Sequence, residues 1–368
     1  MTAQSSIDRS FLLVLIGIVV FGLLVLLSAS GPMGVQKFND SWYFFKHQLL
    51  YGVLPGISAF VILSRMDYRR LRPLAGTGLI VSLILLILVF LPGIGLKFGG
   101  SERWVKLGPI VFQPSEFVKL TFIMYVAAWL SAREKASKTI DEGLFPFVIA
   151  LAMVVGLLIL QPNTGSMAII AGSSVLMYLV AGAPWGWFAI LGAGAGTLLW
   201  VLIKLTPYRA ARFMTFLHPE LDPKGIGYHI NQAYLAIGSG GLFGMGYGHS
   251  RQKYLYIPEA ASDSVFAVMA EELGFFIAVG FIAAIGFLVS RIFAIARRAP
   301  DLFGTYLGTG IGCWIAIQSI FNIASMVGLM PITGVTLPFV SYGSSAFIAL
   351  AIGMGVVASI SRQGSTSR

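Results

Sequence analysis

Charged residues and cysteine are scarce in this sequence. Lys, Arg, Asp and Glu make up only 11% of the 368 residues, and Cys313 is the one cysteine. Soluble domains carry about 25% charged residues, so this scarcity, together with a mean hydropathy of +0.85, excludes a soluble globular protein. A single cysteine excludes a disulfide framework and a thiolate metal site. The chain is therefore predicted to be an integral membrane protein.

Signals for a histidine metal site and for nucleic-acid binding are also lacking. The formal net charge is +10, but the basic residues lie in short loops between apolar runs, and no folded basic domain presents them. We expect no nucleic-acid partner. The histidines lie in polar segments without metal-ligand spacing and are His47, His218, His229 and His249.

Long apolar runs are what the sequence has in abundance. They are continuous and about 20 residues long, which is typical of membrane-spanning helices rather than of alternating strands. We predict an all-α polytopic fold, a single transmembrane domain over residues 1–368, whose first run is a span rather than a cleavable signal. The ten expected spans are 11–29, 46–64, 73–92, 115–132, 145–161, 166–183, 185–204, 264–290, 303–326 and 339–360.

The distribution of basic residues predicts the orientation. An even number of spans puts both termini on one side of the membrane. If that side is the cytoplasm, the inside segments carry thirteen Lys and Arg and the short outside loops carry five. Because basic residues are enriched in cytoplasmic loops, both termini are expected on the cytoplasmic side of the membrane.

Three segments are then candidates for an extracytoplasmic site. The loop 92–114 is cationic, with Lys97, Arg103 and Lys106. The segment 206–262, between the seventh and eighth spans, is far longer than a connector requires. Its glycine-rich run 238–248 lacks the Gly-Lys-Ser/Thr of a phosphate loop, so we interpret it as a structural turn or re-entrant backbone. The Pro- and Gly-rich segment 331–345 is expected to be broken backbone that lines a polar cavity.

Asp263 is the most informative single residue. It stands where a polar segment ends and a long apolar helix begins, and a carboxylate at membrane depth is rarely kept without a partner or a task. Asp263 can be a helix N-cap, although Ser262 would cap equally well, or a general base. Glu271 is eight residues away, about 12 Å along a helix, too far for a glycosidase pair. Glu271 and Glu272 are therefore expected to be buried structural partners.

Glu116 and Lys119 form a second candidate. They lie three residues apart in the first turns of the span that begins near Pro114, so they share one face and can pair. One interpretation is a self-neutralised helix pair. The other is that Lys119 faces an outer cavity and binds an anion together with Arg103 and Lys106.

Several motifs together resemble the SEDS family of bacterial cell-wall glycosyltransferases, the FtsW, RodA and SpoVE group. They occur in the family order over essentially the whole chain, and several spaced motifs in order are specific. The matching stretches are Arg103-Trp104, Gln113-Pro-Ser-Glu-Phe-Val-Lys119, Gln161-Pro-Asn-Thr-Gly165, Gly225-Ile-Gly-Tyr-His-Ile-Asn-Gln232, Tyr256-Ile-Pro-Glu-Ala260, Glu271-Glu-Leu-Gly274 and Leu337-Pro-Phe-Val-Ser-Tyr-Gly343. The stretches Ser41-Trp-Tyr-Phe-Phe-Lys-His-Gln48 and Gln252-Lys-Tyr-Leu-Tyr-Ile-Pro258 are more similar to the FtsW branch.

The resemblance implies an enzyme that polymerises lipid II into glycan strands at the outer face of the bacterial cytoplasmic membrane. Asp263 would be the general base, and Arg103 and Lys119, with Lys97, Arg212 or Arg251, would hold the pyrophosphate. Further substrate contacts are implied for Glu116, Gln232, Ser341 and Tyr342. No cofactor is certain, although a divalent cation is compatible with this chemistry. The implied partners are a class B penicillin-binding transpeptidase and other division or elongation membrane proteins.

The chain also departs from the family pattern. The usual His-Thr-Asp-Phe is Ala261-Ser-Asp-Ser264, Tyr-Gly-Gly-Ser is Tyr342-Gly-Ser-Ser345, and the acid of Gln-Pro-Asp is Asn163. Alternative functions are therefore a RodA-like elongation polymerase, a transporter that flips lipid II, and a non-catalytic scaffold for division proteins.

Overall fold

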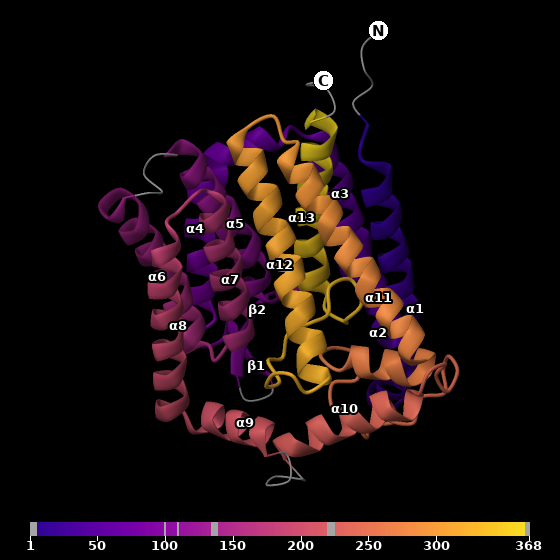
Figure 1. The fold of residues 1–368 in the computed structure, drawn as a ribbon. Coiled ribbons are helices and arrows are strands. Elements are labelled where there is room, and N and C mark those ends of the chain that lie inside the picture. Colours follow the sequence, from indigo (N-terminus) through magenta and orange to yellow (C-terminus); the bar gives the residue numbers. More distant parts are fainter. Residues whose placement is uncertain (1–5, 99–100, 109, 134–138, 219–224, 365–368) are drawn as a thin grey trace.

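The computed structural model describes residues 6–98, 101–108, 110–133, 139–218 and 225–364. Long helices run side by side, and both termini lie at one end of the bundle (Figure 1). We call this the termini end, and the opposite end the Asp263 end. The helices are α1 (Arg9–Phe38), α2 (Tyr43–Gln48), α3 (Leu54–Arg65), α4 (Leu71–Leu88), α5 (Pro114–Ala132), α6 (Phe145–Leu160), α7 (Thr164–Val180), α8 (Trp185–Leu205), α9 (Pro207–Leu217), α10 (Ile226–Gly240), α11 (Val265–Arg297), α12 (Leu302–Met326) and α13 (Ser344–Gly364), with the short turns η1 (Leu49–Val53), η2 (Tyr68–Arg70) and η4 (Ile140–Leu144).

A helix stands at each of the ten predicted spans. Within the described residues, eight helical stretches are long and apolar enough to cross a membrane. The other two predicted spans correspond to α5, which carries Glu116 and Lys119, and to α7, an apolar helix of 17 residues. The prediction of a polytopic helical protein is confirmed, and the count of ten membrane crossings stays a prediction.

The centre of the bundle is formed by α12 and its neighbours. α12 packs against α5, α7, α11 and α13, and most of its residues are buried, including the fully enclosed Trp314. α8 lies at the edge of the bundle (Figure 1) and exposes nearly all of its apolar residues. Lipid tails are as apolar as leucine, so the exposed face of α8 is suited to the membrane interior.

Several helix ends are fixed by local side chains, as the sequence leads one to expect. Asp8 caps α1 by accepting a hydrogen bond from the Phe11 amide at 2.9 Å, and Asp301 caps α12 by accepting from the Gly304 amide at 2.8 Å. Pro114 stands at the first position of α5, where its missing N–H is not needed. α13 begins at Ser344, later than the predicted start at residue 339, because residues 327–343 form irregular backbone.

The Asp263 end is covered by structure that the sequence did not predict. The loop after α4 folds into a small antiparallel sheet of β1 (Gly95–Phe98), β2 (Ser101–Leu107) and β3 (Ile110–Phe112), in the order β1-β2-β3. The long segment after α8 contains α9 and α10, which lie across the end of the bundle (Figure 1). The outer segments are thus an ordered layer over the helix ends.

α11 is interrupted near its start at Gly274. This residue has φ of +79°, a conformation that favours glycine, and a Cβ there would lie 2.3 Å from the Gly244 nitrogen. The glycine-rich run is therefore a structural turn packed against the break in α11, as predicted. The amides of Met245 and Gly246 donate to the carbonyls of Glu271 and Glu272, both at 2.9 Å, which satisfies backbone groups that the break leaves without helical partners.

Candidate active site

Asp263 lies just before α11, held by its backbone rather than by its carboxylate. The Asn322 side chain on α12 donates one hydrogen bond to the Asp263 carbonyl at 2.8 Å and another to the Val335 carbonyl at 2.7 Å. In the described part of the chain, neither carboxylate oxygen of Asp263 has a hydrogen-bond or ion-pair partner, and the residue is partly exposed. Asp263 is thus positioned by its main chain and presents its carboxylate to the site.

The irregular segment 327–343 forms one wall beside this carboxylate. Gly334, at φ of +69°, brings its backbone so close that a Cβ there would lie 3.4 Å from Asp263 Oδ2 and 4.0 Å from Arg103 Nη1. Gly334 therefore lies between the acid and a cation, and any larger residue would fill that space. The prediction that this broken segment lines a polar site agrees with its position.

Two arginines from different outer elements converge on Asp263. Arg103 on β2 donates from Nε to the Gln161 carbonyl at 3.4 Å and from Nη2 to the Pro162 carbonyl. Arg212 on α9 donates from Nη1 to the Ile332 carbonyl at 2.9 Å. Backbone carbonyls thus fix both guanidiniums beside the site. Both charges act on Asp263 and favour its ionised form.

The pKa of Asp263 reflects these opposing influences. Burial in the protein raises the pKa, the nearby Glu259 carboxylate raises it further, and Arg212 and Arg103 lower it, so that it reaches about 6. At neutral pH the carboxylate is therefore ionised while it remains more basic than an ordinary aspartate. Glu259 also accepts a hydrogen bond from Ser262 Oγ at 2.7 Å, so a second carboxylate lies near Asp263.

Lys119 and Glu116 form the predicted pair, and it is buried. Lys119 Nζ lies 2.8 Å from Glu116 Oε2 and donates to Gln318 Oε1 at 2.9 Å, and the lysine side chain is 1% exposed. Lys119 also lies over the Trp314 ring, 5.4 Å from its centroid. Gln318 continues the chain of contacts by donating to the Thr336 carbonyl at 2.9 Å. Through Gln318, Lys119 therefore supports the irregular segment 327–343 from the interior of the bundle.

Gln318 and Asn322 on α12 act together on that wall. They are four residues apart and so share one helix face. Between them they hold the carbonyls of Thr336, Val335 and Asp263. One helix face thus fixes both the acid and the wall beside it.

The remaining predicted site residues are spread around this centre. Ser341 Oγ accepts from the Leu337 amide at 2.7 Å and donates to the Ser262 carbonyl at 2.6 Å, which ties the wall to the Asp263 segment. The Tyr342 hydroxyl lies 3.0 Å from His47 Nδ1, the Tyr342 amide donates to the Ala261 carbonyl at 2.8 Å, and Gln232 is partly buried on α10. The side chain of Lys97 on β1 lies outside the described part of the structure.

His229 is a residue of this region that sequence reasoning missed. Its Nε2 lies 2.6 Å from Ser264 Oγ, which donates to the Pro258 carbonyl at 2.8 Å, so His229 is the donor to Ser264. Burial and the charge of Arg212 lower the pKa of His229 to about 4, so the ring is neutral at pH 7. The motif from Gly225 to Gln232 was the available signal, and metal-ligand spacing was the wrong criterion for this histidine.

Glu271 and Glu272 are buried structural partners, as predicted. Lys253 Nζ lies 2.8 Å from Glu272 Oε1, and Ser28 Oγ, which donates one proton to this carboxylate, lies 2.7 and 2.8 Å from its two oxygens. Glu271 accepts from Ser250 Oγ and from the amide of Arg251 at 3.0 Å. Both carboxylates therefore hold the turn 248–254 against α11 and α1.

The donor set near Asp263 is small for a resident metal ion. Among the residues that the structure describes, no three His, Cys, Asp or Glu side chains are grouped to hold a metal. Asp263 and Glu259 are the acids of this region among the described residues, and both arginines would compete with a cation for them.

Comparisons with known proteins agree with this architecture. A family model described as the FtsW/RodA/SpoVE cell cycle proteins matches residues 8–366. A curated protein of Trichlorobacter lovleyi named probable peptidoglycan glycosyltransferase FtsW is 38% identical over 96% of this chain and 93% of its own length. Stage V sporulation protein E of Bacillus subtilis is 37% identical over 98% of both chains.

Solved structures of similar fold cover nearly the whole chain. One comes from work titled "Structural coordination of polymerization and crosslinking by a peptidoglycan synthase complex", with a TM-score of 0.79, 29% identity and coverage of 97% of this chain and 98% of that one. The rod shape determining protein RodA of Thermus thermophilus has a TM-score of 0.70, 29% identity and 97% coverage of both chains. With a family match over nearly its entire length, this chain belongs to the FtsW/RodA/SpoVE family of cell cycle proteins.

Proposed function

We propose that this protein is a peptidoglycan glycosyltransferase that polymerises lipid II, with Asp263 as its general base. The observation that carries the proposal is the Asp263 carboxylate itself: it is held by its main chain, it has no partner among the described residues, and its pKa is raised to about 6. Curated relatives over nearly full length bear the name peptidoglycan glycosyltransferase, which supports the same activity.

The chemistry uses these residues in separate roles. Asp263 removes the proton of the acceptor sugar's 4-hydroxyl as that oxygen attacks the anomeric carbon of the donor. The new glycosidic bond forms as the bond from that carbon to the lipid pyrophosphate breaks, with inversion. The pyrophosphate leaves as an anion and needs no proton, so one base suffices and no second catalytic acid is required.

Arg103 and Arg212 are suited to the departing pyrophosphate. Guanidinium groups match phosphate oxygens with paired N–H donors. Both side chains are already fixed by backbone carbonyls, so little reorganisation is needed when negative charge develops. We assign Lys119 and Glu116 to positioning: their buried pair supports Gln318 and thereby the wall at Thr336.

We also infer the setting of the enzyme from its family and charge pattern. The Asp263 end would face outward from the bacterial cytoplasmic membrane, with both termini in the cytoplasm. A class B penicillin-binding transpeptidase is the expected partner, which is consistent with the polymerisation and crosslinking named for the similar complex. FtsW-named relatives favour a septal role, and RodA-like elongation is the second candidate.

A gel assay for glycan strands made from lipid II tests the function directly. The purified protein, alone and with its transpeptidase, should form polymer, and Asp263→Asn should not. Asp40→Asn is the matched control, because it makes the same change in an exposed pair with Lys46, where surface ion pairs contribute little. Near-normal polymer from Asp263→Asn would contradict the assignment of the base. Vectorial lipid II movement without polymer would favour the transporter, and neither activity would favour the scaffold.

A further inference from the structure

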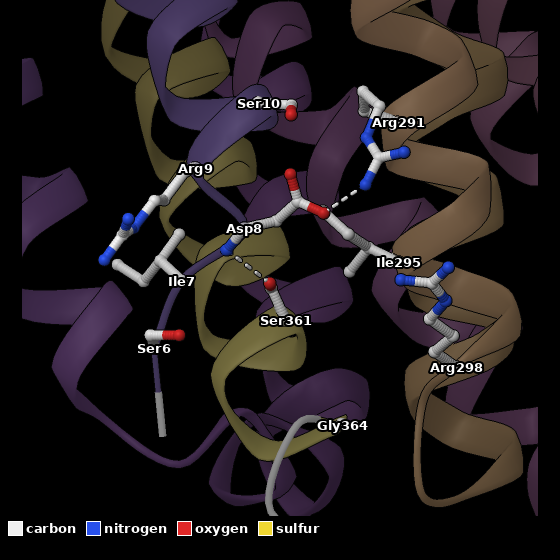
Figure 2. Close-up of a pocket in the computed structure, with 10 residues that line it drawn as sticks. All are labelled: Ser6, Ile7, Asp8, Arg9, Ser10, Arg291, Ile295, Arg298, Ser361 and Gly364. Carbon is white, nitrogen blue, oxygen red and sulfur yellow. Dashed lines mark hydrogen bonds and ion pairs between the residues drawn. The ribbon is translucent and has the colours of Figure 1, made fainter. Parts of the chain in front are cut away.

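A second charged cavity lies far from Asp263, at the termini end of the bundle. It has a volume of about 440 Å³ and is bordered by the start of α1 and by the ends of α11 and α13. Figure 2 shows Arg291 and Arg298 on the α11 side and Asp8 and Ser361 across from them. The remaining lining residues are Ser6, Ile7, Arg9, Ser10, Ile295 and Gly364. The proposed reaction uses none of these residues.

Positive charge exceeds negative charge in this cavity. Three arginines line it, Arg9, Arg291 and Arg298, and Asp8 is the one acid among its lining residues. Asp8 is fully occupied, because one carboxylate oxygen caps α1 through the Phe11 amide and the other accepts from Arg291 Nη2. Asp8 therefore neutralises one guanidinium and leaves two.

Donor groups in the cavity are left without acceptors. Arg291 Nε has no hydrogen-bond partner among the described residues, and 26% of the Arg291 side chain is exposed. The Arg298 guanidinium is exposed, and within the described ranges no residue pairs with it. The Arg298 guanidinium and the exposed part of the Arg291 guanidinium can therefore donate charge-assisted hydrogen bonds to a ligand that supplies acceptor oxygens. The two guanidiniums project from the same end of α11, which favours one anion that both can reach.

The surroundings favour an anion that carries an apolar chain. Both helices that border the cavity expose apolar side chains about one helical turn away from it. α1 exposes Leu13, with 71% of its surface accessible, and α11 exposes Phe287, and the two helices are in contact. A phosphate headgroup in the cavity would therefore place its acyl chain beside exposed apolar side chains. Basic pockets between membrane helices commonly hold anionic lipid headgroups.

We propose that this cavity binds the phosphate headgroup of an anionic phospholipid through Arg291 and Arg298. The bound lipid would tie the start of α1 to the end of α11, and Ser361 would link both to α13 through the hydrogen bond that it accepts from the Asp8 amide at 2.9 Å. This proposal is independent of the proposed activity, since it concerns the opposite end of the bundle.

Lipid binding to the purified full-length protein tests the proposal. After delipidation, phosphatidylglycerol and phosphatidylcholine are compared by native mass spectrometry and thermal unfolding. We expect phosphatidylglycerol to bind and to raise the melting temperature, and Arg298→Gln to weaken that binding about tenfold, the value of one charge-assisted contact. Arg298 is the better probe than Arg291, since removing Arg291 strands Asp8 and can unfold the site.

Arg297→Gln is the matched control, because Arg297 is exposed in the same turn and does not line the cavity. Equal binding of the two lipids, or equal weakening by Arg297→Gln and Arg298→Gln, would overturn the proposal. Inorganic phosphate is the third arm. If phosphate alone protects the protein as well as phosphatidylglycerol and loses its effect in Arg298→Gln, the lipid assignment is wrong.

Discussion

Asp263 lies just before α11, and Glu271 and Glu272 lie two turns further along the chain, within that helix. The structure holds these carboxylates in opposite ways. Glu271 and Glu272 are buried and their oxygens are bonded to Lys253, Ser28, Ser250 and nearby amides. Asp263, just before the helix, is held through its carbonyl, and its carboxylate has no partner among the described residues. A carboxylate with all its hydrogen-bond and ion-pair partners stabilises one packing arrangement. A carboxylate that is held in place without such partners can accept a proton.

The largest effect on activity should follow from removing the carboxylate of Asp263. Asp263→Asn should lower the rate of lipid II polymerisation about 100- to 10,000-fold, the usual contribution of a general base. The protein should remain folded, because the Asn322 bond to the residue 263 carbonyl is unaffected. Initial rates from labelled lipid II, normalised to folded protein, measure the change.

The same variant has a stability signature with a definite sign. The folded pKa of Asp263 is about 6, above its ordinary 3.8, so ionisation costs stability as pH rises through about 6. Asp263→Asn should therefore melt at an equal or higher temperature than the wild type at pH 7.5, with the difference shrinking toward pH 4. A lower melting temperature at pH 7.5 would indicate a structural cap instead.

Removing the carboxylate of Glu272 should lower the stability of the protein rather than its activity. Glu272→Gln leaves Lys253, which is 4% exposed, without its carboxylate. Removing one partner of a buried ion pair typically costs about 3–5 kcal/mol. The melting temperature should fall strongly, while polymer formed per folded molecule should stay near normal. A stable Glu272→Gln protein with lost activity would reverse the roles assigned to the two groups.

Arg103 should give a smaller catalytic effect. Arg103→Gln removes a cation from the site, and we expect a fall in rate of about 10- to 100-fold from lost charge stabilisation. The acid limb of the pH–rate profile should also move to higher pH, because Arg103 lowers the pKa of Asp263. Lys204→Gln is the control, since Lys204 is an exposed cation in the last turn of α8, directly before α9, and has no assigned role in the site. Equal losses from both variants would point to general attraction of the anionic substrate.

The smallest effect is a shift of the pH profile by Glu259→Gln. In the wild type kcat/KM should rise with pH through about 6 and then level off, because Asp263 must be ionised to accept a proton. Glu259 raises the pKa of Asp263, so Glu259→Gln should move the acid limb of the pH–rate profile to lower pH. If the acid limb is unchanged in Glu259→Gln, then Glu259 does not influence the group that titrates in the pH–rate profile.

The sequence predicted those features that depend on local pattern. Continuous hydropathy located a helix at every expected span, and helical spacing paired Glu116 with Lys119. The same spacing separated Asp263 from Glu271, and the family motifs drew attention to Arg103. These features depend on neighbours along the chain, so a single sequence carries them.

Features that depend on contacts between distant segments were not predictable. Asn322 reaches Asp263 across 59 residues, and His229 reaches Ser264 across 35. The small outer sheet consists of strands of three to seven residues, too short to be distinguished from a loop by alternation. The segment 206–262 was expected to be more than a connector, but the position of α9 and α10 across the bundle end depends on packing.

Polymer formation by purified Asp263→Asn beside Glu272→Gln, each normalised to folded protein, tests the central claim most directly. The account predicts no detectable glycan strand from Asp263→Asn at a melting temperature no lower than that of the wild type. It predicts strands from whatever fraction of Glu272→Gln remains folded. Strand formation by Asp263→Asn at a near-normal rate would contradict it.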